Sequence, residues 1–353
     1  MVFSPISIWT ILAVLLEGST GKTENELKLK LKMSYRDHDE GVQILRSRYN
    51  DVIRSLEDKN GTSTEFSSLN FVITDKNVTS EFKKIFENYY HGKYFNIDNK
   101  KSNLFSVVVN GWAQDESNGR IKSIVSSDML DNVVMILGNA VYFKSKWKYP
   151  FDSSDTFPMP FKNDNGKVIA NIPMMNVAAV LPLGYNSYLD SQIIEIPYED
   201  DVTSMIIILP HQKTGLEKVL SLMKSLTLDE IIPKNTSEET VQISLPKFRV
   251  TSKMYLNDIF QKELPTMFSS QSAEFHRIGK DVFVSKIYHK AEIENSEEGT
   301  IVSAVSRVQF PYKSSSSVFR ADHPFVYLIN DIKTRTILFA GTFSNPFMAT
   351  TSF

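Results

Sequence analysis

The chain of 353 residues contains no cysteine. Disulfide bonds, thiolate metal sites and a thiol nucleophile are therefore excluded. It also lacks a long apolar run: the most apolar N-terminal stretch covers only residues 6–16, whereas a membrane-spanning helix needs about 20 residues. Glu17 and Gly18 follow this stretch directly. We interpret it as a buried helix with Ser4 as its N-cap and Pro5 at the first helical position.

An excess of charge of either sign is also missing. The 39 basic and 41 acidic residues give a net charge of -2, so nothing in the overall charge attracts nucleic acid or an anionic membrane, and we predict neither as a partner. No linker rich in Pro, Gly or Ser separates two patterned blocks, and there is no internal repeat. With 42% hydrophobic residues, the chain can close one large core, so we predict a single domain over residues 1–353.

Motifs of catalysis and cofactor binding are absent as well. The segment from Gly18 to Thr23 is similar to the end of a phosphate-binding loop, but Leu16 stands where that loop needs its first glycine. We interpret the segment as a turn between helices. The six histidines have no metal-ligand spacing, and no Gly-x-Ser-x-Gly elbow occurs. The sequence therefore predicts no cofactor, no metal site and no enzyme.

Hydrophobic periodicity predicts helices early in the chain and strands later, which favours an α+β domain. The predicted helices cover residues 6–16, 23–33, 42–56, 81–90, 106–114, 216–226 and 254–263. The predicted strands cover residues 69–74, 133–143, 192–197, 205–209, 241–245, 282–289, 325–329 and 336–340.

Ordered short motifs then connect the chain to a family. They are Val2 to Ile8, Asn139 to Lys144, Pro173 to Met175, Ile196 to Tyr198, Ser204 to Pro210, Leu245 to Phe248, Glu298 to Thr300, His323 to Phe325 and Phe339 to Gly341. Their content and order resemble those of serpins over essentially the whole chain. The resemblance implies the serpin fold, with about nine helices around three β-sheets and an exposed reactive-centre loop at approximately residues 299–322.

The chain departs from the family pattern in two places. Serpins begin with an N-terminal helix, preceded in secreted members by a signal peptide, and this chain starts at the motif that follows. The resemblance favours a secreted, extracellular protein, with a cytoplasmic one as the alternative; secretion would make Asn60, Asn77 and Asn235 glycosylation acceptors. The second departure is the hinge of the loop, which lacks the family's run of alanines. The hinge consists of Glu298, Gly299, Thr300, Ile301, Val302, Ser303 and Ala304.

The resemblance also implies where a protease cuts. In serpins the cleaved bond lies about fourteen residues after the hinge glycine, which predicts Lys313–Ser314, with Arg307 as a minor alternative. The cation of Lys313 fits the acidic pocket of a trypsin-like serine protease. Tyr312, which follows Phe310 and Pro311, provides the large apolar group that papain-like cysteine proteases select before Lys or Arg.

We therefore predict an inhibitor that acts as a suicide substrate: the cleaved loop inserts into a sheet as a new strand while the protease is attached as an acyl-enzyme. Charged Arg307 must then face solvent, which places the small or apolar residues 300, 302, 304, 306, 308 and 310 on the buried side. A non-inhibitory serpin with a carrier, chaperone or storage role is the alternative, because Ile301 and Val302 are bulkier than alanine.

We expect a monomer that does not bind glycosaminoglycan. The basic candidates for such binding lie among acidic residues, as is typical of solvated helix faces. They are Arg46, Arg48, Arg54, Lys83 and Lys84.

Overall fold

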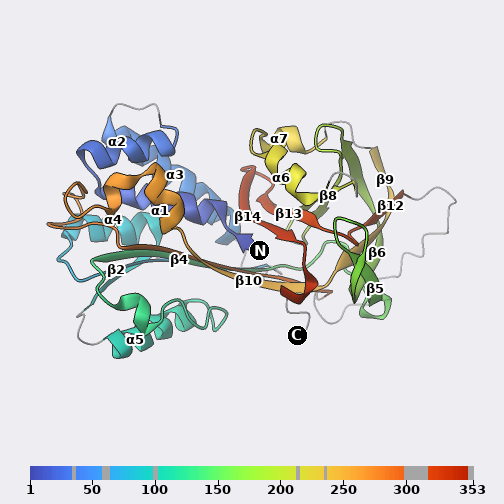
Figure 1. The fold of residues 1–353 in the computed structure, drawn as a ribbon, viewed down its shortest axis with the longest axis horizontal. Helices are drawn as coiled ribbons and strands as arrows, with labels where there is room; N and C mark the ends of the chain where they lie inside the picture. Colours follow the sequence, from blue (N-terminus) through green and yellow to red (C-terminus); the bar gives the residue numbers. More distant parts are fainter. Residues whose placement is uncertain are drawn as a thin grey trace.

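The structure is a computed structural model, and it describes residues 1–33, 37–57, 64–97, 102–211, 215–233, 237–297 and 317–348. Within these ranges the chain forms eight α-helices, a five-stranded sheet and a nine-stranded sheet (Figure 1). The predicted α+β class is confirmed. No helix in the described ranges is long and apolar enough to cross a membrane.

The five-stranded sheet has the strand order β10-β11-β4-β2-β3. These strands are β10 (Phe248–Tyr255), β11 (Lys286–Asn295), β4 (Met135–Lys144), β2 (Glu65–Thr74) and β3 (Gly92–Asn96). Two neighbouring pairs, β11 with β4 and β2 with β3, run parallel, and the other pairs run antiparallel. The central strand β4 is buried at nine of its ten positions, as expected for a strand covered on both faces.

Helices cover both faces of this sheet. On one face lie α1 (Pro5–Gly18), α2 (Gly21–Lys30), α3 (His38–Glu57) and α4 (Ser80–Tyr90), and on the other lies α5 (Ser102–Glu116) (Figure 1). Alternate strand residues serve the two faces: Val72 and Leu137 pack into the cluster that contains α1, whereas Phe71 and Ile136 pack against α5.

The first helix forms as its sequence predicts. The Ser4 hydroxyl accepts a hydrogen bond from the Ser7 N–H at 3.3 Å, and Pro5 occupies the first turn. Glu17 is 3% exposed, and its carboxylate binds the Arg46 guanidinium at 2.7 Å. Only Ser19 and Thr20 separate α1 from α2, so the turn is shorter than the predicted segment from Gly18 to Thr23, whose last three residues begin α2.

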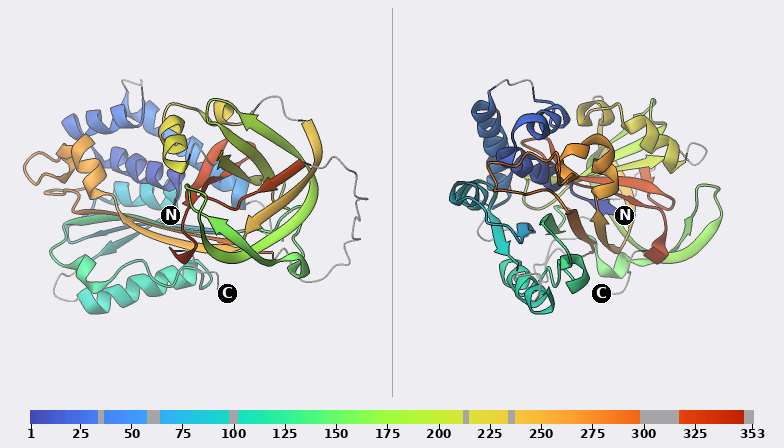
Figure 2. Two further views of the ribbon diagram at one scale, coloured as in Figure 1. Left: turned by 45° about the vertical axis from the view of Figure 1, so that its right-hand side comes forward. Right: turned by 60° about the vertical axis from the view of Figure 1, so that its left-hand side comes forward.

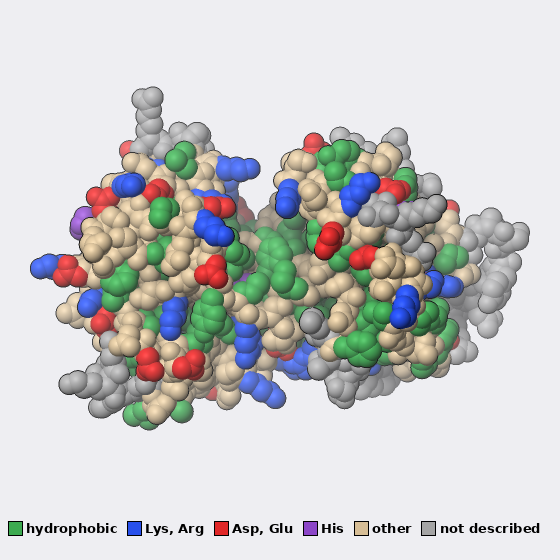
Figure 3. Space-filling model, viewed as in Figure 1, with side chains coloured by type: hydrophobic (Ala, Val, Ile, Leu, Met, Phe, Trp, Pro, Cys, Tyr) green, Lys and Arg blue, Asp and Glu red, His purple; other side chains and the backbone are tan. Residues whose placement is uncertain are grey.

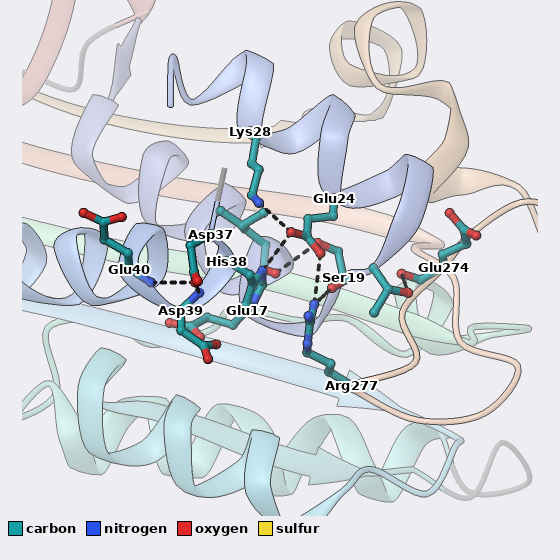
Figure 4. A network of polar contacts seen from close by, with 12 residues as sticks. Glu17, Ser19, Glu24, Lys28, Asp37, His38, Asp39, Glu40, Glu274 and Arg277 are labelled. Atoms are coloured by element: carbon teal, nitrogen blue, oxygen red, sulfur yellow. Dashed lines mark hydrogen bonds and ion pairs between the residues drawn. The ribbon is translucent and has the colours of Figure 1, made fainter. Parts of the chain in front are cut away.

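A second polar network fixes α2 against its surroundings. The Glu24 carboxylate lies 2.7 Å from Lys28 Nζ, 3.1 Å from His38 Nδ1 and 3.1 Å from Arg277 Nη1 (Figure 4). Burial alone would raise the pKa of Glu24, but the hydrogen bonds from Lys28 and Arg277 outweigh it and hold the pKa below its usual value. The network joins α2 to the start of α3 and to the segment that leads to β11.

The nine-stranded sheet lies at the end of the molecule away from helices α1 to α5 (Figure 2). Its order is β1-β14-β13-β8-β7-β6-β9-β12, and β5 also pairs with β6. The strands are β1 (Val2–Phe3), β14 (Thr336–Phe343), β13 (Phe325–Asp331), β8 (Thr203–Pro210), β7 (Ser191–Pro197), β6 (Val168–Asn186), β9 (Ser237–Pro246), β12 (Ser317–Arg320) and β5 (Phe157–Lys162). Helices α6 (Leu216–Met223) and α7 (Leu228–Ile231) follow β8, and α8 (Asn257–Glu263) follows β10.

The number of sheets differs from the expected three. Strand β6 is 19 residues long; it pairs with β7 near its C-terminal end and with β9 along most of its length. Its length joins two groups of strands into one hydrogen-bonded sheet, so the described residues form two sheets.

Several predicted boundaries are wrong. Strands β6 and β10 were not predicted, and the helix expected at 254–263 begins only at Asn257 because residues 254 and 255 complete β10. Strand β11 extends to Asn295, beyond the predicted end at 289. Residues 317–320, expected within the exposed loop, form β12 by pairing in parallel with β9.

Candidate functional site at the seam between β4 and β11

The two central strands β4 and β11 meet in a parallel seam, in register from Lys286 opposite Ile136 to Ile293 opposite Phe143. Strand β11 ends at Asn295, the chain is described as far as Glu297, and it is described again from Ser317, which begins β12 in the other sheet. A strand that turned back after β11 would run antiparallel to β11, and therefore also antiparallel to β4. Placed in the seam, it would replace one parallel pairing by two antiparallel pairings, which are slightly more stable per residue.

Polar side chains cluster in the middle of this seam, on the face toward α1. His289 of β11 lies opposite Asn139 of β4 in the register, and its Nε2 atom accepts the N–H of Ser4 at 2.9 Å. The Ser7 hydroxyl donates to the Ser4 hydroxyl at 2.9 Å. All four residues are at most 3% exposed, so the start of α1 reaches the seam through hydrogen bonds.

Two buried polar atoms of the seam have no hydrogen-bond partner among the described residues: Nδ1 of His289 and Oδ1 of Asn139. Burial lowers the pKa of His289 to about 4, so the imidazole is neutral at pH 7. Because Nε2 accepts a hydrogen bond, we assign the ring proton to Nδ1. An unpaired donor and an unpaired acceptor therefore lie on opposite strands, and each such group costs about 1–3 kcal/mol.

The amide nitrogen of Asn139, in contrast, is well satisfied. It donates to Asn70 Oδ1 at 2.7 Å and to the Ser68 hydroxyl at 3.2 Å, both on β2. Asn70 in turn donates to the Tyr49 hydroxyl at 2.9 Å and to the Tyr90 carbonyl at 2.8 Å. These contacts anchor β4 to β2, α3 and α4, whereas no such side-chain bond links Asn139 to β11 among the described residues.

On the face toward α5, two lysines of β11 hold the segment that joins α5 to β4. Lys290 Nζ donates to the Ser123 carbonyl at 3.1 Å, and Lys286 Nζ donates to the Met129 carbonyl at 2.7 Å. Burial lowers the pKa of Lys290. The joining segment thus contacts β11 directly, and opening of the seam would have to displace it.

Ion pairs close the end of the seam from which the chain leaves β11. Lys144 Nζ of β4 lies 2.8 Å from the Glu294 carboxylate of β11, and Lys247 Nζ lies 2.7 Å from the Glu297 carboxylate. Burial alone would raise the pKa of Glu297, but hydrogen bonding, chiefly from Lys247, holds it below its usual value. The buried Trp147 donates its indole N–H to the Ser296 carbonyl at 3.2 Å. These contacts define where the chain departs from the sheet.

Comparison with known proteins identifies the fold. The family profile described as "Serpin (serine protease inhibitor)" matches residues 1–346. The chain belongs to the serpin family. An uncharacterized serpin-like protein of Thermococcus kodakarensis is 32% identical to this serpin over 98% of the chain and 80% of the relative. The human leukocyte elastase inhibitor is 30% identical over 97% of the chain and 92% of the relative.

Solved structures agree with this assignment. The serpin-12 of Manduca sexta superposes with a TM-score of 0.85 at 24% identity, covering 98% of this chain and 93% of that one. Native protease nexin-1 with heparin superposes with a TM-score of 0.84 at 25% identity, covering 98% and 92%. The predicted serpin fold is confirmed. The family is described as one of serine protease inhibitors, not of enzymes, and no group of metal-binding side chains occurs among the described residues of this serpin.

The predicted reactive bond and hinge of this serpin fall in residues 298–316, outside the described residues. They comprise Glu298, Gly299, Thr300, Ile301, Val302, Ser303, Ala304, Phe310, Pro311, Tyr312, Lys313 and Ser314. The structure does place the two ends of this segment: Glu297 is held by Lys247, and the Ser317 hydroxyl donates to Glu239 at 2.9 Å.

The other candidate residues are dispersed over the helices. The Arg46 guanidinium is bound by the Glu17 carboxylate. Arg48, Arg54 and Lys84 are exposed. Lys83 Nζ lies 4.3 Å from the centre of the Tyr94 ring. Asn77 is exposed just before α4. Asn60 and Asn235 lie outside the described residues.

The polar cluster of this serpin was not predicted. Ser4, Ser7 and Asn139 stood within quoted motifs, and His289 counted only as a histidine without metal-ligand spacing. One sequence feature could have indicated the cluster: a single polar residue, Asn139, within the apolar run from Met135 to Phe143. A buried polar group needs a hydrogen-bond partner, so such a residue predicts further polar side chains nearby.

Proposed function

We propose that this serpin inhibits a protease as a suicide substrate. The protease nucleophile attacks the carbonyl carbon of Lys313, the bond to Ser314 breaks, and the amine of Ser314 leaves with a proton supplied by the protease. The residues before Lys313 then enter the seam between β4 and β11. Insertion carries the acyl-enzyme away before water hydrolyses it.

The parallel seam with its unpaired polar centre is the observation that carries this proposal. The segment upstream of the reactive bond follows β11 directly in the chain, so a turn after Glu297 directs it along the seam. The eleven residues 300–310 span about 36 Å when extended, against about 33 Å for the ten residues of β11. The inserted strand has about the length of the seam, and its backbone groups would pair with those of β4 and β11.

A non-inhibitory serpin remains the second candidate because of the hinge. Ile301 and Val302 are β-branched, and slow insertion would let the acyl-enzyme hydrolyse. Two sequence features favour the inhibitor. Branched side chains suit a strand, and no proline occurs between residues 300 and 310. Relatives named as inhibitors, such as the intracellular coagulation inhibitor 2 of Tachypleus tridentatus at 29% identity, also favour an inhibitor over a non-inhibitory serpin.

For the target we place a trypsin-like serine protease first and a papain-like cysteine protease second. Lys313 provides the cation for an acidic specificity pocket, and Tyr312 the large group for a papain-like subsite. Replacing Lys313 with Ala should abolish trypsin-like recognition and preserve much of the papain-like recognition.

The test is incubation of the protein with trypsin and, separately, with a papain-like protease, followed by denaturing electrophoresis. An inhibitor gives a covalent complex that survives denaturation and a released C-terminal fragment that begins at Ser314. Complete cleavage without a complex would show a substrate, and another fragment start would move the reactive bond.

Matched hinge variants separate insertion from recognition. Ala304→Arg puts a charge on the predicted buried side of the inserted strand, where it cannot be solvated. Ser303→Arg puts the same charge on the solvent side. We expect Ala304→Arg to be cleaved without forming a complex, whereas Ser303→Arg still forms one. Equal behaviour of the two variants would contradict the insertion step.

A further inference from the structure

The chain contains four Asn-Gly pairs. In such a pair the backbone nitrogen of glycine can attack the side-chain carbonyl carbon of asparagine, because glycine has no Cβ atom to hinder the approach. Asn60 with Gly61 lies outside the described residues. The other three pairs are described: Asn110 with Gly111, Asn118 with Gly119, and Asn165 with Gly166. One dipeptide thus occurs in three surroundings, and the contacts of each decide whether the attack can take place.

Asn110 lies within α5, and both ends of its side-chain amide are occupied. Its Nδ2 atom donates to the Val125 carbonyl at 2.8 Å. Its Oδ1 atom accepts the N–H groups of Ile124 and Val125 at 2.8 and 3.0 Å. The amide carbon cannot turn toward the Gly111 nitrogen without breaking these bonds and distorting the helix. The surroundings therefore protect this pair.

Asn118 is exposed just after α5 and has the left-handed conformation, with φ of 49°. The N–H of Gly119 donates to the Gln114 carbonyl at 2.7 Å and so closes the C-terminal end of α5. This helix is anchored to the sheet by the buried side chains of Val109 and Ala113. The attacking nitrogen is thus held by a packed helix, whose last turn would have to unwind first.

Asn165 lies in the turn between β5 and β6, which the neighbouring Asn163 closes. The Asn163 carbonyl accepts the N–H of Gly166 at 2.9 Å. Its side-chain oxygen accepts the N–H groups of Asn165 and Lys167 at 3.1 and 3.0 Å. Residues 164–168 are exposed, and the Asn165 side chain has no hydrogen-bond partner among the described residues. A turn closed by such short-range bonds opens at low cost.

We propose that Asn165 is a site of spontaneous deamidation. When the turn opens, hydroxide removes the proton from the Gly166 nitrogen, which attacks Cγ of Asn165. A bond forms between this nitrogen and Cγ, the bond from Cγ to Nδ2 breaks, and ammonia leaves with a proton taken from water. Water then opens the cyclic imide at either carbonyl, which gives aspartate or isoaspartate. The reaction needs only water, and it does not rest on the inhibitory function.

The charges around the turn do not oppose this reaction. A strongly acidic surface would repel the hydroxide that starts it. On the visible surface of the end that holds the nine-stranded sheet, acidic and basic side chains are interspersed (Figure 3, right). Within the turn itself, the exposed Asp164 and Lys167 carry opposite charges. Hydroxide therefore reaches the Gly166 nitrogen without a net repulsion from the turn.

The modification changes a contact with α6. The Asp164 carboxylate accepts the N–H of Leu216, the first residue of this helix, at 3.2 Å. Isoaspartate at position 165 routes the main chain through the former side chain and adds one methylene group to it. The turn then no longer matches its bonds to Asn163, and Asp164 moves with it. We expect the Leu216 N–H to lose its acceptor at the start of the helix.

Peptide mapping of native protein aged at mildly alkaline pH in water labelled with heavy oxygen tests the proposal. The peptide with Asn165 should take up heavy oxygen first and give both aspartate and isoaspartate, whereas the peptide with Asn110 remains unlabelled. In urea, all three pairs should react at rates within a few-fold of one another, because the structure no longer protects any of them. Native Asn165 that reacts no faster than native Asn118 overturns the proposal, and aspartate without isoaspartate overturns the imide route.

Two variants test the role of the turn. Asn163→Ala removes the side-chain acceptor and should speed labelling at Asn165 several-fold, with Asn118 as the unchanged internal control. Asn165→Gln keeps an amide but must form a larger ring, so labelling at this position should be lost. Amide hydrogen exchange at Leu216 should rise in the aged wild type and stay constant in aged Asn165→Gln. An unchanged rate at Asn165 in Asn163→Ala overturns control by turn opening, and equal exchange in both aged proteins overturns the coupling to α6.

Discussion

The acid sensitivity of the closed seam follows from one residue, His289. Its side chain is fully buried between β4, β11 and the start of α1, and burial lowers its pKa to about 4, against an ordinary value of 6.5. The native pKa is lower than the pKa in the unfolded chain. The contribution of this histidine to stability is therefore fully present above pH 6.5 and is lost as the pH falls toward 4, because the unfolded chain then binds a proton that the native chain does not.

The size of the effect follows from the two pKa values. A difference of about 2.5 pKa units corresponds to about 3 kcal/mol once the pH is below both values. Most of this appears by pH 5, where the unfolded chain is almost fully protonated at this position and the native chain is mostly neutral. We therefore expect His289 to lower the free energy of unfolding by about 2 kcal/mol between pH 7 and pH 5.

The measurement is urea unfolding of the intact protein at both pH values, compared with His289→Gln. Glutamine retains an acceptor for the Ser4 N–H but does not titrate. Partly buried carboxylates with lowered pKa, such as Glu24 and Asp322, destabilise both proteins at low pH and cancel in the difference. The reasoning is refuted if His289→Gln loses as much stability between pH 7 and pH 5 as the wild type.

Three further predictions concern single polar contacts, two of them at the seam and one between α1 and α3. Lys144→Gln breaks the ion pair with Glu294 that crosses the seam; native stability in urea unfolding should fall by at most about 1 kcal/mol, and the proposed insertion of the cleaved loop, followed as a gain in thermal stability, should be faster. Glu17→Gln leaves the Arg46 guanidinium without its buried carboxylate, which should cost about 3 kcal/mol in urea unfolding. Trp147→Phe removes the indole hydrogen bond next to the end of β11 and should cost about 1 kcal/mol by the same assay.

Local sequence was sufficient to predict an element when its capping residues, its proline positions and its hydrophobic pattern all indicated the same structure. The first helix combines a capping serine, a proline in the first turn and an apolar run, and its start was predicted correctly. Strand β6 carries the opposite kind of signal: it contains Pro173 and Pro182, which argue against a strand interior. Pairing with neighbouring strands on both sides nevertheless holds this segment extended. Tertiary contacts thus decided what local preference could not.

The candidate site was even less accessible to sequence reasoning. Ser4, Asn139 and His289 are far apart in the chain; the pairing of β11 with β4 brings His289 to Asn139, and the packing of the start of α1 brings Ser4 to His289. Periodicity predicts that a strand exists but not which strand lies beside it or in which register. The composition of the loop pointed to insertion, whereas the seam that could receive it required the three-dimensional arrangement.

The contacts across the seam bear on how a strand would enter it under the proposed function. Gly138 and Ala140 lie on β4 and Ala291 lies on β11, but large apolar residues also face each other across the seam: Leu137 lies opposite Ile287, and Phe143 opposite Ile293. A partly exposed lysine forms the ion pair at one end, and such pairs contribute at most about 1 kcal/mol. In the middle, unpaired His289 and Asn139 atoms oppose closure. Under the proposed function, the backbone hydrogen bonds between β4 and β11 are the ones that an inserted strand would replace.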